Sequence, residues 1–373
     1  MSDHSVLPPS GASSWVKCTA WVKMNERFPE LEESESSREG SAAHEIAAKM
    51  INSARTGNND HNASLYVGSV AKNGVVITEE MFDSAKVYAD SVAFEMTRTN
   101  VFGGEFLGIE HRIDIPTVHK KQFGTVDCFL FDEIRNELII WDFKHGYLKV
   151  EAFENYQLIN YAVGLLDILG INGQQDQETI VRMMVVQPRC YGAEPVREWS
   201  VIASELRGYV NTLKMQGDIA LSDQATCTTG PQCTYCPGRH ACEPALQQGL
   251  SLYEITSKNL PDDANVGVMG LQLRLIKRAL KQLGAIESGI SEQLEYRIRH
   301  GEAVPFWKLG MKSSKRAWNM TDKQVIDTGV LMGVDLAKTT VITPTQAKKA
   351  GMNEETVNAL SKNIGKLSLI EDG

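Results

Sequence analysis

The sequence contains no long hydrophobic run and nothing that resembles a secretion signal. Its first residues, MSDHSVLPPSGASSW, include no basic stretch leading into an apolar one. No later segment approaches the roughly eighteen uninterrupted apolar residues that a membrane helix needs. Internal repeats and low-complexity tracts are also absent. We therefore expect a soluble protein that stays in the cytoplasm.

Positive charge is scarce as well. The chain has 38 Lys and Arg against 47 Asp and Glu, which gives a formal net charge of -9. Phosphate contacts come largely from Lys and Arg, so this balance argues against a nonspecific polycationic DNA-binding protein. Any nucleic-acid site must be a local basic groove, or must gather around a metal ion that supplies positive charge itself. With 373 residues, the chain can bury at least one full core and has room for a second domain.

The seven cysteines are unevenly distributed. Cys128 and Cys190 lie in or beside apolar, strand-like stretches and are expected to be small buried hydrophobes. Cys18 stands alone near the start of the sequence. The remaining four are crowded into the segment CTTGPQCTYCPGRHAC, as Cys227, Cys233, Cys236 and Cys242. Because the chain has no secretion signal, these clustered thiols are better interpreted as metal ligands than as disulfides.

Hydrophobic periodicity predicts an α/β protein. Apolar residues at helical spacing predict helices over about 36–50, 78–99, 151–169 and 204–221, with Thr78 as the N-cap of the second. Alternating or continuous apolar runs predict strands over 104–115, 124–132, 137–146 and 178–188. The turn-like sequence EIRN separates the second and third strands, so these two should be antiparallel neighbours. This order of elements describes a mixed sheet flanked by helices.

The residues suited to catalysis lie on the strands. Asp142 and Lys144 are two apart in ELIIWDFK and leave the same face of the strand, while Trp141 and Phe143 pack on the other. Asp127 lies on the neighbouring strand. Two carboxylates beside an ammonium group would suit a Mg²⁺ or Mn²⁺ site for phosphodiester hydrolysis. A lone D-x-K is common, however, and by itself it more often indicates a solvated ion pair.

The helix that follows adds two polar side chains at helical spacing. Gln157 and Tyr161 are four residues apart, so they share one face near the strand end that bears Asp142. They could cap a core edge, or they could contact a DNA strand. On its own, His44 in the first helix would more often be an ordinary surface or core histidine.

Taken together, these motifs resemble the RecB-like branch of the PD-(D/E)XK nucleases. The shared order is G-x-x-x-H, G-x-V-D, D-x-K and Q-x-x-x-Y, which spans Gly40 to Tyr161. The resemblance implies a restriction-endonuclease-like core and a divalent metal held by His44, Asp127 and Asp142. It also implies catalysis by Asp127, Asp142 and Lys144, and DNA contacts by Gln157 and Tyr161. Glu110 is a further candidate acid near this site.

The cysteine pattern resembles the iron–sulfur staple of AddB-type and CRISPR-associated nucleases of the same branch. One early cysteine is followed by a late C-x2-C-x5-C, here Cys18 with Cys233, Cys236 and Cys242. The resemblance implies a [4Fe–4S] cluster that pins the N-terminal segment to the far edge of the nuclease domain and has no catalytic role. Zinc held by four thiolates would serve the same purpose. Cys227 could replace one of the four.

The opening PSGASSWVKCTA and the later REGSAAHEIA are similar to a family of phage and prophage proteins classed with these nucleases. That resemblance implies a DNA exonuclease of recombination or replication, acting in the bacterial host cytoplasm beside a phage single-strand annealing protein. The alternatives are an endonuclease of the same fold and a noncatalytic DNA-binding or scaffold protein. On this interpretation the nuclease domain covers residues 1–249.

Residues 250–373 form the expected C-terminal extension, which is mainly helical. A long amphipathic helix should have a break near Gly284, with an apolar stripe made of Leu273, Ile276, Leu280 and Leu283. The stretch VPFWKLGMKSSKRAW follows, in which aromatic residues bracket basic ones, namely Trp307, Trp318, Lys308, Lys312, Lys315 and Arg316. Such a segment could bind single-stranded DNA, or it could be a basic β-hairpin whose charges are simply solvated.

Overall fold

A computed structural model describes most of the chain. The described residues are 5–28, 33–58, 62–190, 193–257, 265–311, 315–318, 322–336, 343–344, 347, 351–364 and 367–371. The chain divides into two compact units, Met1–Ile286 and Glu287–Gly373. The first unit therefore extends beyond residue 249. Arg239 links its last part to the rest by donating a hydrogen bond from Nε to the Ala285 carbonyl at 3.0 Å.

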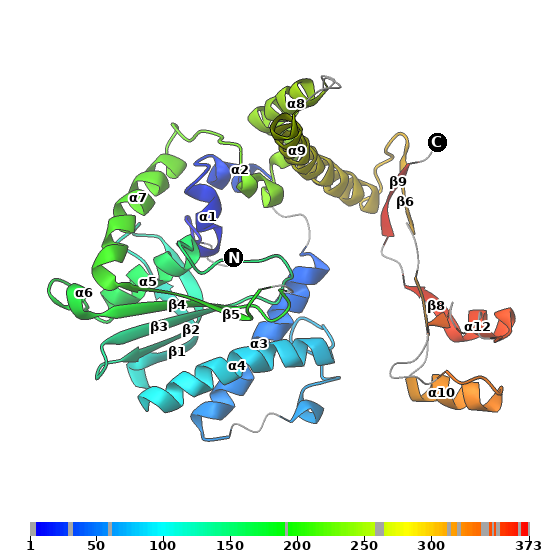
Figure 1. Cartoon of the computed structure of the whole chain (residues 1–373), viewed down its shortest axis with the longest axis horizontal. Coiled ribbons are helices and arrows are strands. Elements are labelled where there is room, and N and C mark those ends of the chain that lie inside the picture. The colour runs from blue at the N-terminus through cyan, green and yellow to red at the C-terminus, as the bar shows by residue number, and fades with distance from the viewer. Residues whose placement is uncertain are drawn as a thin grey trace. The chain divides into compact units, whose positions relative to one another are not determined.

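A five-stranded sheet lies at the centre of the first unit (Figure 1). Its strands, in spatial order, are β1 Leu107–Asp114, β2 Phe123–Asp132, β3 Glu137–Phe143, β4 Ile180–Val186 and β5 Val196–Ile202. The β3 and β4 strands are parallel, and every other neighbouring pair is antiparallel. The expected mixed sheet is thus confirmed. The edge strand β5 was not predicted from the sequence.

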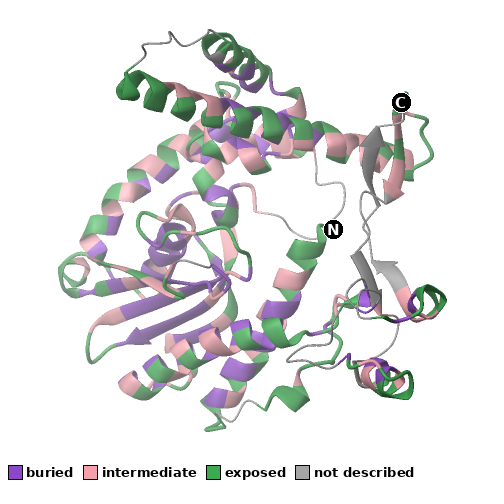
Figure 2. Cartoon of the chain, turned by 45° about the vertical axis from the view of Figure 1, so that its right-hand side comes forward, coloured by how far each residue is buried: buried purple, intermediate pink, exposed green. Residues whose placement is uncertain are grey.

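Helices cover both faces of this sheet (Figure 1). On one face, α3 Glu35–Arg55 and α4 Glu79–Thr99 share a core with Ile139 and Trp141 of β3. On the other face, α5 Tyr156–Ile168 and α7 Ala203–Leu221 share a core with Leu138 and Ile140 of the same strand. Figure 2 shows the buried residues concentrated on the strands and on the helix faces that meet them. The fold is therefore the predicted α/β sandwich.

Side-chain caps set where three of these helices begin. Ser34, Thr78 and Asn155 each accept a hydrogen bond from a backbone N–H of the first helical turn. The Thr78 cap was predicted from the sequence. The third cap places the start of α5 after residue 155, so the segment 144–155 that was partly expected to be helical is a loop instead.

The N-terminal segment packs across the α5 side of the sheet. It contains η1 Pro9–Gly11, α1 Ala12–Trp15 and α2 Trp21–Arg27. Trp15 is fully buried, and its Nε1–H donates to the Pro8 carbonyl at 3.0 Å. The buried Gln122 donates from Nε2 to the Leu7 carbonyl at 2.9 Å. These contacts fix the path that leads to Cys18.

Short elements and two further helices complete the first unit. They are η2 Ala63–Leu65, η3 Gly104–Phe106, α6 Gln175–Glu178, η4 Pro231–Tyr235, η5 Arg239–Ala241, α8 Glu243–Thr256 and the first part of α9 Val266–Arg299. The α9 helix continues through Gly284, so the expected break is wrong. The expected apolar stripe is mostly exposed, since Leu273 and Leu280 are 53% and 64% exposed. Ala279, Ala285 and Ile286 are buried in its place.

The second unit combines helices with two small sheets. Its elements after α9 include β6 Trp307–Met311, β7 Lys315–Trp318, α10 Asp322–Leu331, α12 Glu354–Leu360, β8 Ser361–Ile364 and β9 Leu367–Glu371. The C-terminal region is thus helical, as expected. The basic hairpin is wrong: β6 pairs with β9 and β7 with β8, so the two basic strands pair with the C-terminal strands and not with each other. Lys312 lies outside the described residues.

No helix in the described ranges is long enough and apolar enough to cross a membrane.

Candidate metal centre and active site

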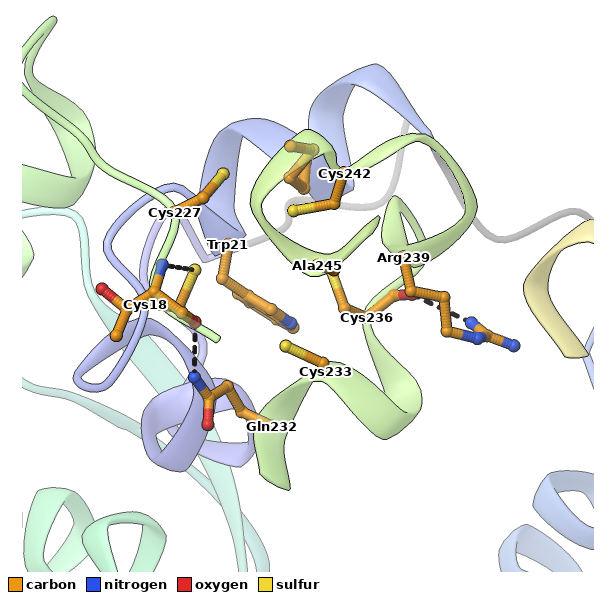
Figure 3. A pocket seen from close by; sticks show the side chains of 11 residues that line it. Cys18, Trp21, Cys227, Gln232, Cys233, Cys236, Arg239, Cys242 and Ala245 are labelled. Carbon is orange, nitrogen blue, oxygen red and sulfur yellow. Dashed lines mark hydrogen bonds between the residues drawn. The ribbon is translucent and has the colours of Figure 1, made fainter. Parts of the chain in front are cut away.

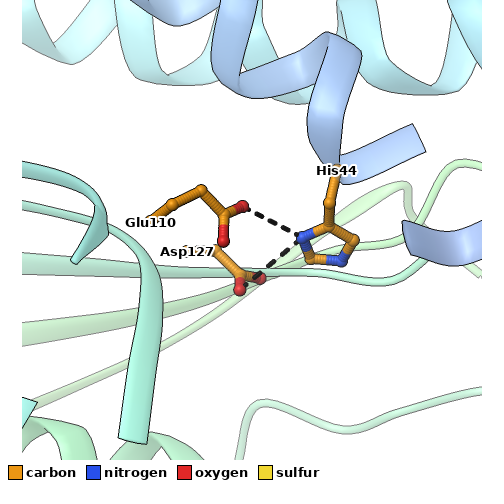
Figure 4. A group of neighbouring side chains, drawn as sticks. All are labelled: His44, Glu110 and Asp127. Carbon is orange, nitrogen blue, oxygen red and sulfur yellow. Dashed lines mark hydrogen bonds and ion pairs between the residues drawn. The ribbon is translucent and has the colours of Figure 1, made fainter. Parts of the chain in front are cut away.

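Three side chains from separate elements converge near the end of β3, where β2 separates from it (Figure 4). His44 comes from α3, Glu110 from β1 and Asp127 from β2. His44 Nδ1 lies 3.4 Å from Glu110 Oε1 and 3.6 Å from Asp127 Oδ1. One potential ligand atom from each residue lies within 4.8 Å of the other two, so the three could hold a metal ion together.

Asp127 is held where β2 separates from β3. The pairing between these strands begins at Cys128 and Trp141, one residue beyond Asp127. Beyond this point β2 offers no backbone partner to the N–H of Phe143. That N–H donates instead to the carboxylate of Asp127, at 2.7 Å from Oδ2. The carbonyl of Phe143 lies 3.0 Å from His44 Nε2. The end of β3 therefore fixes both Asp127 and His44 through one residue.

Glu110 reaches this site through an unusual backbone conformation. Its φ angle is 46°, in the left-handed region that a residue within a strand seldom adopts. Strain of this kind persists only where surrounding contacts impose it, and it is frequent at functional sites. The sequence suggested Glu110 only as an additional acid, because strand alternation carries no signal for a left-handed residue. The structure makes it a full member of the three-residue group.

A second group of side chains lies on the α5 face of β3. Lys144 Nζ is 2.9 Å from Asp142 Oδ1, as expected for two side chains on one strand face. Gln157 from α5 donates from Nε2 to the same oxygen of Asp142 at 2.9 Å and accepts from Lys144 Nζ at 3.3 Å. Asp142 is 1% exposed, and its other oxygen, Oδ2, has no hydrogen-bond partner among the described residues. Gln157 thus contacts the acid and the lysine themselves.

The electrostatics of the two groups are linked. Burial raises the pKa of both Asp127 and Asp142, although nearby His44 and Lys144 work in the opposite direction. Burial would lower the pKa of His44, but the carboxylates of Asp127 and Glu110 outweigh it and raise the pKa to about 9. Lys144 also gains a raised pKa from the two aspartates, which again outweigh burial. Concentrated buried carboxylates of this kind favour the approach of a cation.

Tyr161 completes the site from the next turn of α5. It is 4% exposed, and burial raises the pKa of its phenol, with the charges of Asp127 and Asp142 adding to the effect. Its ring packs against Gly124. A Cβ atom at this glycine would lie 2.9 Å from the Tyr161 ring and 2.8 Å from the side chain of Pro9. The glycine of G-x-V-D is therefore required by close packing.

The structure therefore brings all the proposed active-site residues to one end of the sheet. These are His44, Asp127, Asp142, Lys144, Gln157 and Tyr161, with Glu110 added. Their roles in metal binding, catalysis and DNA contact stay predictions.

Five cysteines line a separate pocket (Figure 3), formed by Cys18, Cys227, Cys233, Cys236 and Cys242. All but Cys227 are buried. Two backbone N–H groups point at sulfur atoms, from Thr228 to Cys18 and from Gly230 to Cys233, each at 3.4 Å. Such donors stabilise a thiolate. Cys227 lies in the pocket with the other four, so the structure leaves it as a fifth candidate ligand.

The cysteine sulfurs do not form one tight group, although those of Cys227 and Cys242 lie within hydrogen-bonding reach of each other. Among the described residues, no three of them lie within 4.8 Å of one another. A single tetrahedral zinc with Zn–S bonds of about 2.3 Å would bring its sulfurs to about 3.8 Å. Burial raises the pKa of Cys236 to about 11 and that of Cys227 to about 12, so thiolates here need a cation to stabilise them. Cys128 and Cys190 are buried elsewhere, as predicted.

The chain can be compared with known protein families by its sequence and with known structures by its fold. A family model described as "Protein of unknown function (DUF2800)" matches residues 4–370, so the chain belongs to that family.

Two crystal structures are similar in part. One, from Eubacterium rectale, is named "Putative exonuclease"; the match has 9% identity and a TM-score of 0.35, and covers 70% of this chain and 92% of that one. The other, SSO0001, matches with 12% identity and a TM-score of 0.25 over 60% of this chain and 94% of that one.

Proposed function

We propose that this protein is a metal-dependent nuclease that hydrolyses phosphodiester bonds of DNA. The observation that carries the proposal is the convergence of His44, Glu110 and Asp127 beside the Asp142–Lys144 pair at one end of the sheet. An imidazole and several carboxylates next to a lysine are the groups that metal-assisted phosphodiester hydrolysis requires. The order of motifs in the sequence supports the same assignment.

The residues present fit a divalent cation. Carboxylate oxygens are the ligands that Mg²⁺ and Mn²⁺ prefer, and imidazole is compatible with Mn²⁺. Asp142 Oδ2 is buried without a hydrogen-bond partner in the described part of the chain, which would be costly unless a cation or water meets it. His44, Asp127 and Asp142 would hold the metal, with Glu110 as a further ligand. When bound, such a cation polarises the scissile phosphate and acidifies a water molecule.

The other side chains would act on the substrate. The ammonium group of Lys144 would orient the attacking water or neutralise the negative charge that develops on the phosphate. Asp142 and Gln157 hold that ammonium group in place through contacts of 2.9 and 3.3 Å. Tyr161 would contact the DNA strand near the cut. Gln157 would share that contact once a substrate displaces one of its present bonds.

The finer proposal is that the enzyme is an exonuclease that processes DNA ends. It rests on the resemblance to RecB-like domains with the same Q-x-x-x-Y motif. A phage recombination setting and a single-strand annealing partner stay predictions from sequence resemblance.

We further propose that Cys18, Cys233, Cys236 and Cys242 bind a [4Fe–4S] cluster. Their common pocket supports this, and so does the C-x2-C-x5-C spacing of the last three in the sequence. Cys18 precedes α2, whereas the other three lie around η4 and η5, so a cluster would join the two ends of the first unit. Its effect would be on stability and not on the chemistry of cleavage.

The proposal is tested by incubating purified protein with end-labelled linear DNA and with closed circular DNA, in Mn²⁺ and in a chelator. An exonuclease releases nucleotides from the linear substrate in Mn²⁺ only and leaves the circle intact. Cleavage of the circular DNA would show that the enzyme is an endonuclease and not an exonuclease. No cleavage of either substrate by folded, metal-loaded protein would overturn the nuclease proposal.

A further inference from the structure

Three of the side-chain hydrogen bonds to the backbone of the loop after Lys144 come from one buried residue, Gln187. Residues 146–149 are all exposed, including Tyr147 at 53% and Leu148 at 68%, so apolar burial does not fix this stretch. Gln187, at the end of β4, is 1% exposed and lies beneath it. The loop leads from Lys144, which directly follows β3, to Asn155, which caps α5 two residues before Gln157.

Every hydrogen-bonding position of the Gln187 side-chain amide is occupied, and most of its partners belong to this loop. Its Nε2 donates to the carbonyls of Gly146 and Leu148, both at 2.7 Å. Its Oε1 accepts the N–H of Val150 at 3.0 Å and one N–H of Arg197 at 2.6 Å. A side-chain amide has two donor hydrogens and two acceptor positions, and all four are satisfied here. Three of the four partners belong to the backbone of the loop.

A neighbouring arginine supports the same loop. Arg189 is 9% exposed and donates from Nη1 to the His145 carbonyl at 3.3 Å. Its guanidinium lies over the Tyr147 ring at 4.0 Å from the centroid. The backbone from His145 to Val150 is therefore bound at four points by side chains that follow β4.

We propose that Gln187 is a positioning residue for the Lys144–Gln157 hydrogen bond. Lys144 lies at one end of the clamped loop and Gln157 lies just beyond the other end, so the path of the loop sets how these two side chains meet. Gln187 touches neither the substrate nor the metal on this account. The inference rests on the proposed function, because its effect is measured through cleavage.

The test is a double-mutant cycle on cleavage of linear DNA in Mn²⁺. Gln187→Ala is expected to lower kcat by about 10- to 100-fold, since small misplacements of catalytic groups cost up to about 10²-fold. The Kd for DNA, measured in Ca²⁺, should change little. In a Gln157→Ala background the same substitution should lower kcat far less, because the bond that it positions is already absent.

Two further variants separate positioning from simple loss of stability. Gln187→Glu keeps the two bonds accepted by the side-chain oxygen but turns a second carboxylate oxygen toward the carbonyls of Gly146 and Leu148, which repel it, so its kcat should be at least as low as that of Gln187→Ala. Gln122→Ala removes another buried amide, one that bonds Leu7 and Asn160, and its effect should be the same in both backgrounds.

An unchanged kcat in Gln187→Ala, or an equal fold-change in both backgrounds, would overturn the positioning role while leaving the nuclease intact. Absence of cleavage by wild type would instead reject the proposed function itself.

Discussion

The two proposed ligand groups of the first unit are built in opposite ways. In the proposed metal centre, the protein's own hydrogen bonds hold the side chains: Phe143 contacts both Asp127 and His44, and Gln157 contacts Asp142 and Lys144. All of these residues except Lys144, which directly follows β3, lie on a helix or on a strand of the sheet. In the cysteine pocket, the ligands lie on short 3-10 turns and loops, and few hydrogen bonds reach the sulfurs.

The difference predicts how each group depends on its metal. A preorganised centre should keep its shape when the cation leaves, so metal removal costs activity and little stability. A pocket without its own framework should need its ligand to stay folded, as small metal-stapled segments do. Substitutions in each group test whether the two groups differ in this way.

The largest expected effect is on cleavage by Asp127→Asn. The amide keeps an oxygen that can accept the Phe143 N–H but removes the anionic ligand, so the fold should survive while metal binding weakens. We expect cleavage to fall by about 10³-fold or more, at or beyond the upper range for one electrostatic group. Titration calorimetry with Mn²⁺ would measure the metal affinity, and a thermal melt would show whether the fold survives. Unchanged Mn²⁺ affinity would exclude Asp127 from the metal site.

The next effect concerns stability in the cysteine pocket. Cys233→Ser should reduce the free energy of unfolding by about 4 kcal/mol or more, as expected when a structural metal is lost. Anaerobically purified wild type should be brown with broad visible absorbance, and the variant should be pale. If the wild-type protein is colourless and carries one equivalent of zinc, the pocket binds zinc and not an iron–sulfur cluster.

Two glycines of the sequence motifs should respond in opposite directions. Gly124→Ala forces a Cβ against Tyr161 and Pro9, and overpacking of this kind costs about 1–3 kcal/mol. Gly40 lies inside α3, and a Cβ there meets nothing within 4 Å. Gly40→Ala should stabilise the helix by about 0.5–1 kcal/mol. Denaturant titration of both variants checks the pair, and a stable Gly124→Ala would show that Tyr161 is not packed as described.

The smallest effect is expected for Cys227→Ala. This cysteine is the only one of the five in the pocket that is not buried, and the resemblance assigns the four ligands to the others. The variant should keep the visible absorbance and the melting temperature of wild type. Loss of colour would show that Cys227 is a ligand of the cluster in place of one of the four other cysteines.

Much of the core could be predicted from the sequence because its signals are local. The cap of α4, the paired strands β2 and β3, and the shared face of Asp142 and Lys144 all follow from periodicity and turn residues. The mixed sheet followed from the order of these elements. The role of each site residue in metal binding or catalysis is not decided by the fold and stays a prediction.

Other features depended on tertiary contacts that leave no pattern in the sequence. Glu110 joins the metal centre through a positive φ, and Gln157 turns toward Asp142 because of where α5 packs. The edge strand β5 alternates exposed and half-buried residues, a weak signal beside a long helix. The basic strands β6 and β7 pair with segments about fifty residues further along the chain, so local spacing suggested a false hairpin.

The most direct test of the central claim compares wild type with Lys144→Ala on linear DNA at saturating Mn²⁺. The substitution leaves every proposed metal ligand in place, so DNA and metal binding should survive while the cleavage rate falls by about 10²–10³-fold. Lys86→Ala, which changes an exposed lysine on α4, serves as the control and should cleave like wild type. Equal cleavage by Lys144→Ala and wild type would contradict the claim that the end of β3 holds the active site.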